Sequence, residues 1–159
     1  MDHRRVYART LCFIQHKADI LMLQGAPTKR LYPNLFNGVG GHVEAGEDVL
    51  TGLRREVLEE TGLDPQEPRL VAVINADEAG KPGVVLFVFL ARATSQQVRE
   101  SAEGTLHWIP RGSLHQLHLV PDLSELLPRI LNAETTDILY GYYGYDENGK
   151  LSAIQWNAR

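Results

Sequence analysis

The stretch "GHVEAGEDVLTGLRREVLEETGL", residues 41–63, joins a glycine-containing loop to a pattern typical of an amphipathic helix. Its apolar residues recur at helical spacing, and Leu50, Leu53 and Val57 fall within about 60° of arc. We therefore expect these three side chains to face the core. Gly62 stands where helices commonly end in a left-handed residue, so the helix is predicted to stop there.

Three glutamates lie to one side of the apolar stripe of this helix, which is predicted over residues 48–61. Glu56, Glu59 and Glu60 fall on an arc of about 100°, and like charges at these spacings destabilise an isolated helix by roughly a few tenths of a kcal/mol per pair. A hard divalent cation takes carboxylate oxygens and would reverse that repulsion. A solvated helix face beside two arginines is the alternative. The preceding glycines let backbone groups approach a ligand closely, which favours a metal and phosphate site.

The composition is that of an ordinary globular protein. The 159 residues are enough for one core, so we predict a single domain over residues 1–159. The formal net charge of −4 disfavours a surface for a nucleic acid polymer but permits a small polyphosphate carried with a metal. No apolar run is long enough for a membrane span, and the lone Cys12 favours a reduced, cytoplasmic setting. A monomer and a homodimer both stay open.

Strand patterns flank the helix on both sides. Residues 6–15 and 19–24 are predicted to form an antiparallel hairpin. The loop that follows, residues 25–48, is longer than a compact domain usually tolerates unless it carries function. After the helix, residues 69–77 and 83–93 are predicted strands, and the second is apolar along nearly its whole length. That strand is therefore expected to be central in the sheet.

A second helix is predicted over residues 122–132, after Pro121. Asp122 is a candidate for its N-cap, and Pro128 is expected to distort or end its regular part. The other segments are predicted as a loop or short helix over 94–104, a strand over 105–110, one helical turn over 113–117, and a hairpin over 135–158 around its "NG" pair. This order of elements indicates an α+β fold, an α/β/α sandwich around a central mixed β-sheet.

The spacing of residues 41–63 resembles the Nudix box. Every defined position matches: Gly41, five residues, Glu47, seven residues, Arg55, Glu56, the aliphatic Val57, one residue, Glu59, Glu60, one residue, Gly62 and the aliphatic Leu63. The resemblance implies the Nudix fold and hydrolysis of a nucleoside diphosphate linked to another group. It also implies Mg²⁺ or Mn²⁺ as cofactor.

The resemblance also implies roles for the residues of the box. Glu56 and Glu60 would be the main metal ligands, with Glu59 a further ligand or the base that orients water. Glu47 would pair with Arg55 and hold the loop against the helix. The carbonyl of Gly40 or Gly41 would complete the coordination, and the same two glycines would border the substrate. Such a site neutralises the diphosphate and lowers the pKa of a bound water.

A narrower resemblance, to the MutT-type branch that hydrolyses oxidised purine nucleoside triphosphates, covers almost the whole chain. It implies that Asn37 reads the purine, because an amide bonds to two base-edge groups at once; a turn-forming role is the alternative. Asp122 matches a carboxylate that contacts the base, besides its candidacy as helix cap. The chain departs from the branch at Val120 and Leu123, where a stacking Trp and a second Asp are expected.

Further candidates lie outside the box. Glu103 stands where the branch has a carboxylate that reaches the metals, with Glu100 as its rival and a solvated loop residue as the alternative for both. Lys29 is a candidate for phosphate binding or a plain surface residue. The candidates for stacking on a base are Phe36, Tyr32 and Tyr140.

The expected reaction is therefore metal-dependent hydrolysis of a (deoxy)nucleoside triphosphate to the monophosphate and pyrophosphate. Oxidised purine nucleotides such as 8-oxo-dGTP are candidate substrates. Two alternatives stay open: hydrolysis of ADP-ribose or another nucleoside diphosphate ester, and a nucleotide-binding module without catalysis. The second would be expected to carry a damaged box, whereas all the glutamates are present here.

Overall fold

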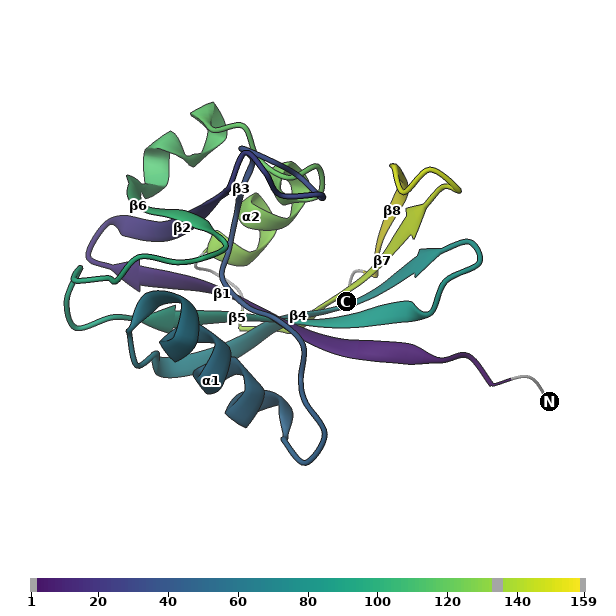
Figure 1. The fold of residues 1–159 in the computed structure, drawn as a ribbon, viewed down its shortest axis with the longest axis horizontal. Coiled ribbons are helices and arrows are strands. Elements are labelled where there is room, and N and C mark those ends of the chain that lie inside the picture. Colours follow the sequence, from purple (N-terminus) through teal and green to yellow (C-terminus); the bar gives the residue numbers. More distant parts are fainter. Residues whose placement is uncertain (1–2, 133–135, 158–159) are drawn as a thin grey trace.

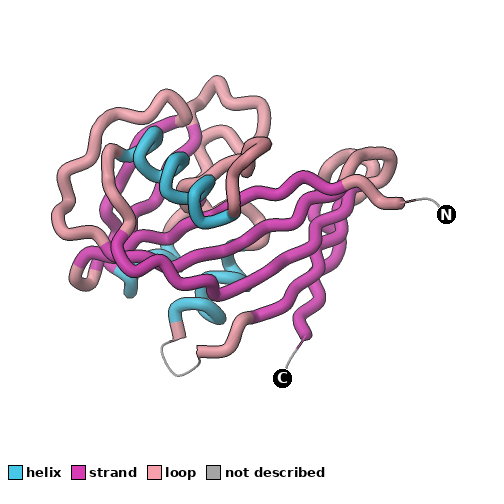
Figure 2. The backbone as a smooth tube through the Cα atoms, turned by 90° about the horizontal axis from the view of Figure 1, so that it is seen from below, coloured by secondary structure: helices cyan, strands magenta, loops and turns pink. Residues whose placement is uncertain are grey.

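A single mixed sheet of eight strands lies between helix α1 (Val49–Thr61) and helix α2 (Leu123–Leu131) in the computed structural model, which describes residues 3–132 and 136–157 (Figure 1). Viewed from below, helices lie on both sides of the sheet (Figure 2). The predicted α/β/α sandwich is thus confirmed. Among these described residues, no helix has the length and apolar character needed to cross a membrane.

The sheet is mixed, and its centre is where the sequence predicted it. Across the sheet the order is β3 (Phe36–Asn37), β2 (Asp19–Gly25), β1 (Val6–His16), β5 (Gly83–Arg92), β4 (Gln66–Glu78), β7 (Leu139–Tyr145) and β8 (Leu151–Asn157), with β6 (Gly104–Pro110) paired to β2. Strand β5 lies between β1 and β4, and the β1–β5 and β4–β7 pairs are parallel while the others are antiparallel.

The predicted β1–β2 hairpin is present but short. Its register covers only three residue pairs next to the turn, and β2 then pairs with β6 over its whole length. The loop at residues 39–43 takes the edge of β1 that β2 leaves. There the N–H of Thr10 donates to the Gly41 carbonyl at 2.8 Å, and the N–H of Cys12 to the Val39 carbonyl at 2.6 Å. The long loop is therefore fixed to the middle of the sheet.

Two clusters of buried side chains flank the sheet, one under each helix. On the α1 side, Leu53 and Val57 are fully buried, as predicted, and Thr61 continues the same face. Leu50 is 40% exposed, so its prediction as a core residue was wrong. Residues spaced by four lie over the sheet in one row, and Leu50 falls outside that row in the first turn of the helix.

The ends of the two helices differ in chemistry. Asp48 caps α1 by accepting the N–H groups of Leu50 and Thr51, and Gly62 ends it at φ 77°, as predicted. Helix α2 runs through Pro128 to Leu131, so of the two expected effects of this proline, distortion or termination, termination does not occur.

The remaining predicted elements fall close to their expected places. A 3₁₀ helix, η1 (Arg111–Gln116), covers the predicted helical turn, and the "NG" hairpin is formed by β7 and β8, with Gly149 at φ 75°. The outer ends of that prediction, residues 135 and 158, lie outside the described residues. The connection between β5 and β6, residues 93–103, forms no regular element.

Candidate active site

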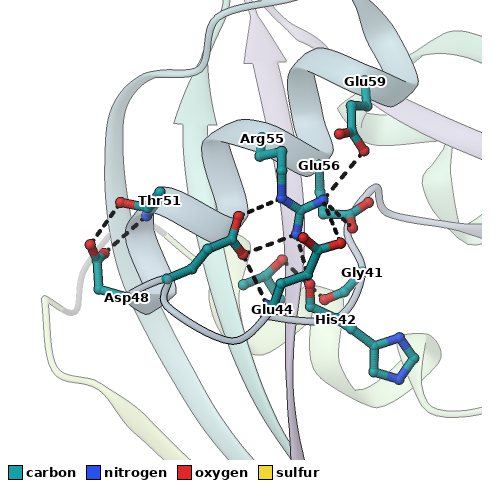
Figure 3. A network of polar contacts seen from close by, with 10 residues as sticks. Gly41, His42, Glu44, Asp48, Thr51, Arg55, Glu56 and Glu59 are labelled. Carbon is teal, nitrogen blue, oxygen red and sulfur yellow. Dashed lines mark hydrogen bonds and ion pairs between the residues drawn. The ribbon is translucent and has the colours of Figure 1, made fainter.

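Arg55 is the centre of a polar network between helix α1 and the loop that precedes it (Figure 3). Its Nε and Nη2 atoms contact the two carboxylate oxygens of Glu47 at 2.5 and 3.0 Å, and Nη2 also donates to the His42 carbonyl at 3.0 Å. Nη1 donates to Glu56 at 2.9 Å and to Glu59 at 3.3 Å. The pairing expected between Glu47 and Arg55 is present, and it holds the loop against the helix.

The network shifts the proton affinities of its members. The hydrogen bonds that Arg55 donates to Glu47 and then to Glu56 raise the pKa of Arg55, which stays fully charged. The same contact lowers the pKa of Glu47, helped by the N–H of Glu44. Gly52 leaves space for this arrangement, because a Cβ on it would lie 3.1 Å from a Glu47 oxygen. Gly52 therefore serves loop packing.

Two glycines bring the backbone of the loop against the sheet and the helix. A Cβ on Gly40 would overlap the Thr10 carbonyl, so only glycine permits the approach of this loop to β1. A Cβ on Gly41 would lie 2.6 Å from both carboxylate oxygens of Glu56. The Glu56 carboxylate is therefore packed directly on the backbone of Gly41.

Among the glutamates of the site, Glu60 has the least compensation for its negative charge. Its Oε2 atom is buried and has no hydrogen-bond partner among the described residues. Burial, followed by the charge of Glu56, raises the pKa of Glu60 to about 7, while the Gly40 backbone N–H and the charge of Lys29 act in the opposite direction. Negative charge is thus held out of water with incomplete compensation, an arrangement that a bound cation would relieve.

The oxygen donors suit a hard cation, although they are not preassembled around one point. Among the described residues, no group of three His, Cys, Asp or Glu side chains has an arrangement ready to hold a metal. Glu56 and Glu59 are bonded to Arg55, and the Gly41 carbonyl accepts the Thr10 N–H. That carbonyl keeps a second lone pair for a ligand. Glu56 and Glu59 each accept from Arg55 through one carboxylate oxygen, so the other oxygen of each remains available to a cation.

Two charged residues outside the box reach the same place. Lys29, in the loop after β2, forms an ion pair with Glu103 at 3.4 Å, and both charges act on Glu60. The backbone of Glu103 is fixed as well, because its carbonyl accepts the N–H of Ala26 at 3.1 Å. The structure thus brings together the predicted phosphate-binding lysine, the predicted accessory carboxylate and the helix glutamates.

The residues predicted to bind the base lie on several separate segments. Asn37, on β3, accepts the N–H of Gly38 at 2.8 Å, which is the local turn use that the sequence left open. Phe36 precedes it, packs against the α2-side core and has its ring 5.5 Å from that of His107. Tyr140 is half exposed on β7, at a position whose parity places it on the opposite sheet face from Tyr143.

Asp122 stands at the predicted N-cap position of α2, and its carbonyl accepts the Leu126 N–H at 3.0 Å. Its backbone is helical, at φ −79° and ψ −21°, and its side chain makes no capping hydrogen bond. Burial raises the pKa of its carboxyl to about 6, against a weaker opposing effect of the Tyr143 hydroxyl. The hydroxyls of Tyr32 and Tyr145 interact with each other and with the charge of Asp122.

Sequence reasoning missed Tyr143 and Tyr145 as neighbours of Asp122. Strand alternation was the available signal, because residues 143 and 145 share a face that faces α2. Val120 and Leu123, the two departures noted above, are buried in the core under α2, with exposed fractions of 3% and 0%. These two side chains therefore pack in the core.

Comparison with known proteins places the chain in a family. The NUDIX domain family matches residues 3–130. The chain is 32% identical over 132 residues to an oxidized purine nucleoside triphosphate hydrolase of Mus musculus, covering 82% of both chains. It is 34% identical over 113 residues to an 8-oxo-dGDP phosphatase of Homo sapiens, covering 68% of this chain but only 33% of the human protein.

The fold comparison agrees with the sequence comparison. The crystal structure of a MutT protein from Bacillus halodurans superposes with a TM-score of 0.82 and 24% identity, over 95% of this chain and 97% of that chain. This likeness concerns the fold. The match of the domain family and the curated relatives, together with the intact box on α1, shows that the chain is a Nudix hydrolase.

Proposed function

We propose that the protein is a divalent-metal-dependent pyrophosphohydrolase that converts nucleoside triphosphates, with purine deoxynucleotides as the leading class, to monophosphate and pyrophosphate. One observation carries the proposal. The buried Oε2 of Glu60 has no hydrogen-bond partner among the described residues, and the negative charges of Glu56 and Glu103 act on this carboxylate. Carboxylates held this way suit Mg²⁺ or Mn²⁺ accompanied by substrate phosphates.

Each acidic residue has a role in this proposal. Glu56 and Glu60 would hold the cation with the Gly41 carbonyl, and Glu103 would add a carboxylate from the β5–β6 connection. When bound, the cation neutralises phosphate charge and lowers the pKa of a water molecule. Glu59 is 60% exposed and needs only to leave Arg55 to orient or deprotonate that water.

The bond changes follow from the substrate. The oxygen of water forms a bond to one phosphorus of the α–β anhydride, and the bond from that phosphorus to the bridging oxygen breaks. The bridging oxygen leaves on the other phosphate, and the proton of the attacking water passes to Glu59. Phosphate binding is assigned to Lys29, because its ion pair with Glu103 is partly exposed and its charge acts on Glu60.

The base would be recognised by Asn37 and Asp122, with Phe36 and Tyr32 as candidate apolar and stacking surfaces. The mouse relative is named for oxidised purine triphosphates and the human one for 8-oxo-dGDP, which supports the choice of oxidised purines as test substrates. Buried Val120 and Leu123 offer no polar group there. The tyrosine hydroxyls beside Asp122 are the polar groups available in their place.

A substrate panel tests the proposal. The protein is incubated with Mg²⁺ and, separately, dGTP, 8-oxo-dGTP, dATP, 8-oxo-dGDP and ADP-ribose, and the products are separated by ion-exchange chromatography. We expect monophosphate and pyrophosphate from a triphosphate, and full loss of turnover when EDTA replaces Mg²⁺. Preferred cleavage of ADP-ribose would reject the triphosphate assignment. Tight metal-dependent binding of nucleotide with no product would instead show a binding module.

A further inference from the structure

The C-terminal end of helix α1 is capped by a cation from outside the helix. The last turn of α1 contains no basic residue. Arg99, in the β5–β6 connection, donates from Nη2 to the carbonyl of Leu58 and, at 3.2 Å, to that of Glu59. Its backbone N–H donates to the Thr61 carbonyl at 3.0 Å. The Leu58 carbonyl also accepts the Gly62 N–H at 2.9 Å. A positive charge at this place is favourable, because the carbonyl end of a helix carries partial negative charge.

The contact depends on the glycine that ends the helix. A Cβ on Gly62 would lie 3.3 Å from Cγ and 3.4 Å from Cδ of Arg99, so the bare glycine lets the arginine side chain run across the helix end. Val98, the residue before Arg99, packs against the core under α1. The connection is therefore attached to α1 at this point by main-chain, side-chain and apolar contacts.

Glu103 follows Arg99 by only four residues. Four residues of extended chain span at most about 14 Å, so the attachment of Arg99 limits how far Glu103 can move from α1. On the far side of Arg99, the connection is held by Gln96, whose carbonyl accepts the Trp108 indole N–H at 3.0 Å. The connection is thus held on both sides of Arg99, at Gln96 and at the Glu103 carbonyl, which accepts the Ala26 N–H. The charge of Glu103 acts on Glu60.

We propose that Arg99 is a positioning residue for hydrolysis. By binding the carbonyls of Leu58 and Glu59, it fastens the β5–β6 connection to the catalytic helix and so presents the Glu103 carboxylate to the acidic cluster. This inference rests on the proposed function, because Glu103 is assigned there to the cation. Loss of Arg99 should therefore weaken cation binding through Glu103, beyond any effect on the stability of α1.

The test is a double-mutant cycle read by cation binding without substrate. Free Mn²⁺ is measured by electron paramagnetic resonance for wild type, Arg99→Met, Glu103→Gln and the double variant. We expect each single variant to weaken Mn²⁺ binding by about tenfold, as for other residues that orient metal ligands. The double variant should bind no more weakly than Glu103→Gln alone. The Mg²⁺ concentration for half-maximal turnover should rise in parallel.

Two further variants separate positioning from folding. Arg92→Met removes an exposed arginine that is paired with Glu67 at 3.2 Å, and it should leave Mn²⁺ binding unchanged. Arg99→Lys keeps the charge at the helix end, with a less specific geometry, and should recover part of the lost affinity. Thermal unfolding of each variant shows whether the fold is kept.

Two results would overturn the inference. One is unchanged Mn²⁺ affinity in Arg99→Met while the wild type binds Mn²⁺, which leaves the proposed function intact. The other is a double variant whose loss equals the product of the single losses, since Arg99 would then act independently of Glu103. Absence of Mn²⁺ binding by the wild type would instead reject the proposed function and, with it, the role of Arg99.

Discussion

Arg55 contacts both carboxylate oxygens of Glu47, with its Nε at 2.5 Å and its Nη2 at 3.0 Å. The two residues lie on the helix and on the loop before it, so this fork joins the two halves of the box. Lysine carries the same charge on a single nitrogen and cannot reproduce the paired contacts. The geometry of the fork, beyond its charge, therefore holds the loop.

Arg55→Lys is expected to lower the free energy of unfolding by about 1 to 2 kcal/mol, because Glu47 and the His42 carbonyl lose hydrogen bonds. Turnover should fall as well. Urea denaturation monitored by circular dichroism gives the comparison. Arg54→Lys is the matched control, since Arg54 pairs with the exposed Asp64 at 3.3 Å and should matter by about 0.5 kcal/mol or less. Equal losses in the two variants would contradict the expectation.

Gly41→Ala should damage catalysis by displacing Glu56, because the added Cβ would lie 2.6 Å from both of its oxygens. A shift of about 1 Å in a catalytic group costs on the order of a hundredfold in rate. We expect a loss of that order in kcat with a folded protein. Gly112→Ala is the control, since a Cβ there meets nothing within 4 Å. Wild-type turnover in Gly41→Ala would refute the packing argument.

Glu60→Gln should have opposite effects on activity and stability. Removing the desolvated charge beside Glu56 is expected to leave the free energy of unfolding in EDTA unchanged or raised. Turnover with Mg²⁺ should drop by about a hundredfold or more, since a proposed metal ligand is lost. The control is Glu44→Gln, whose side chain is 65% exposed and 3.9 Å from Arg55. Near-wild-type turnover in Glu60→Gln would argue against the metal assignment.

The buried carboxyl of Asp122 predicts a pH dependence of stability. Its pKa is raised from 3.8 to about 6, so the folded chain binds an extra proton between these values and wild-type stability falls as pH rises through this window. Asp122→Asn removes the cost of burying the ionised group and should stabilise the fold by about 2 kcal/mol at about pH 7.5.

The gain from Asp122→Asn should disappear below about pH 4, where the folded wild type is protonated. Urea denaturation at both pH values measures the difference. A gain that is the same at both would show that the carboxylate charge is not its cause. Ser124→Ala, on the exposed side of the same helix turn, is the control, and its effect on the free energy of unfolding should be the same at both pH values.

Sequence patterns predicted the elements and the pairing of Glu47 with Arg55, and failed where tertiary contacts decide. The row of Leu53 and Val57 was readable from spacing, whereas Leu50 lies in the first turn outside that row and is exposed. Asp122 stands at the predicted N-cap position, but nothing local showed that its side chain makes no capping hydrogen bond and interacts with Tyr143 instead.

The rest of the site depends on partners distant in sequence. The role of Gly40 follows from the position of Thr10 on β1, and the ion pair of Lys29 with Glu103 joins segments that no local pattern connects. The contacts of Arg99 with the end of α1 are of the same kind. Spacing identified the glutamates of the box, but not the side chains that hold or surround them.

The glycine loop lies along β1, and β1 is itself paired in parallel with β5 from Val6 with Gly83 to Gln15 with Arg92. A ribosome that has made α1 has therefore not yet made the strand that supports its loop. Pairings so far apart in sequence form slowly, and domains fold as units during synthesis. A nascent chain that contains all the residues of the box would therefore have no hydrolase activity until β5 has been synthesised.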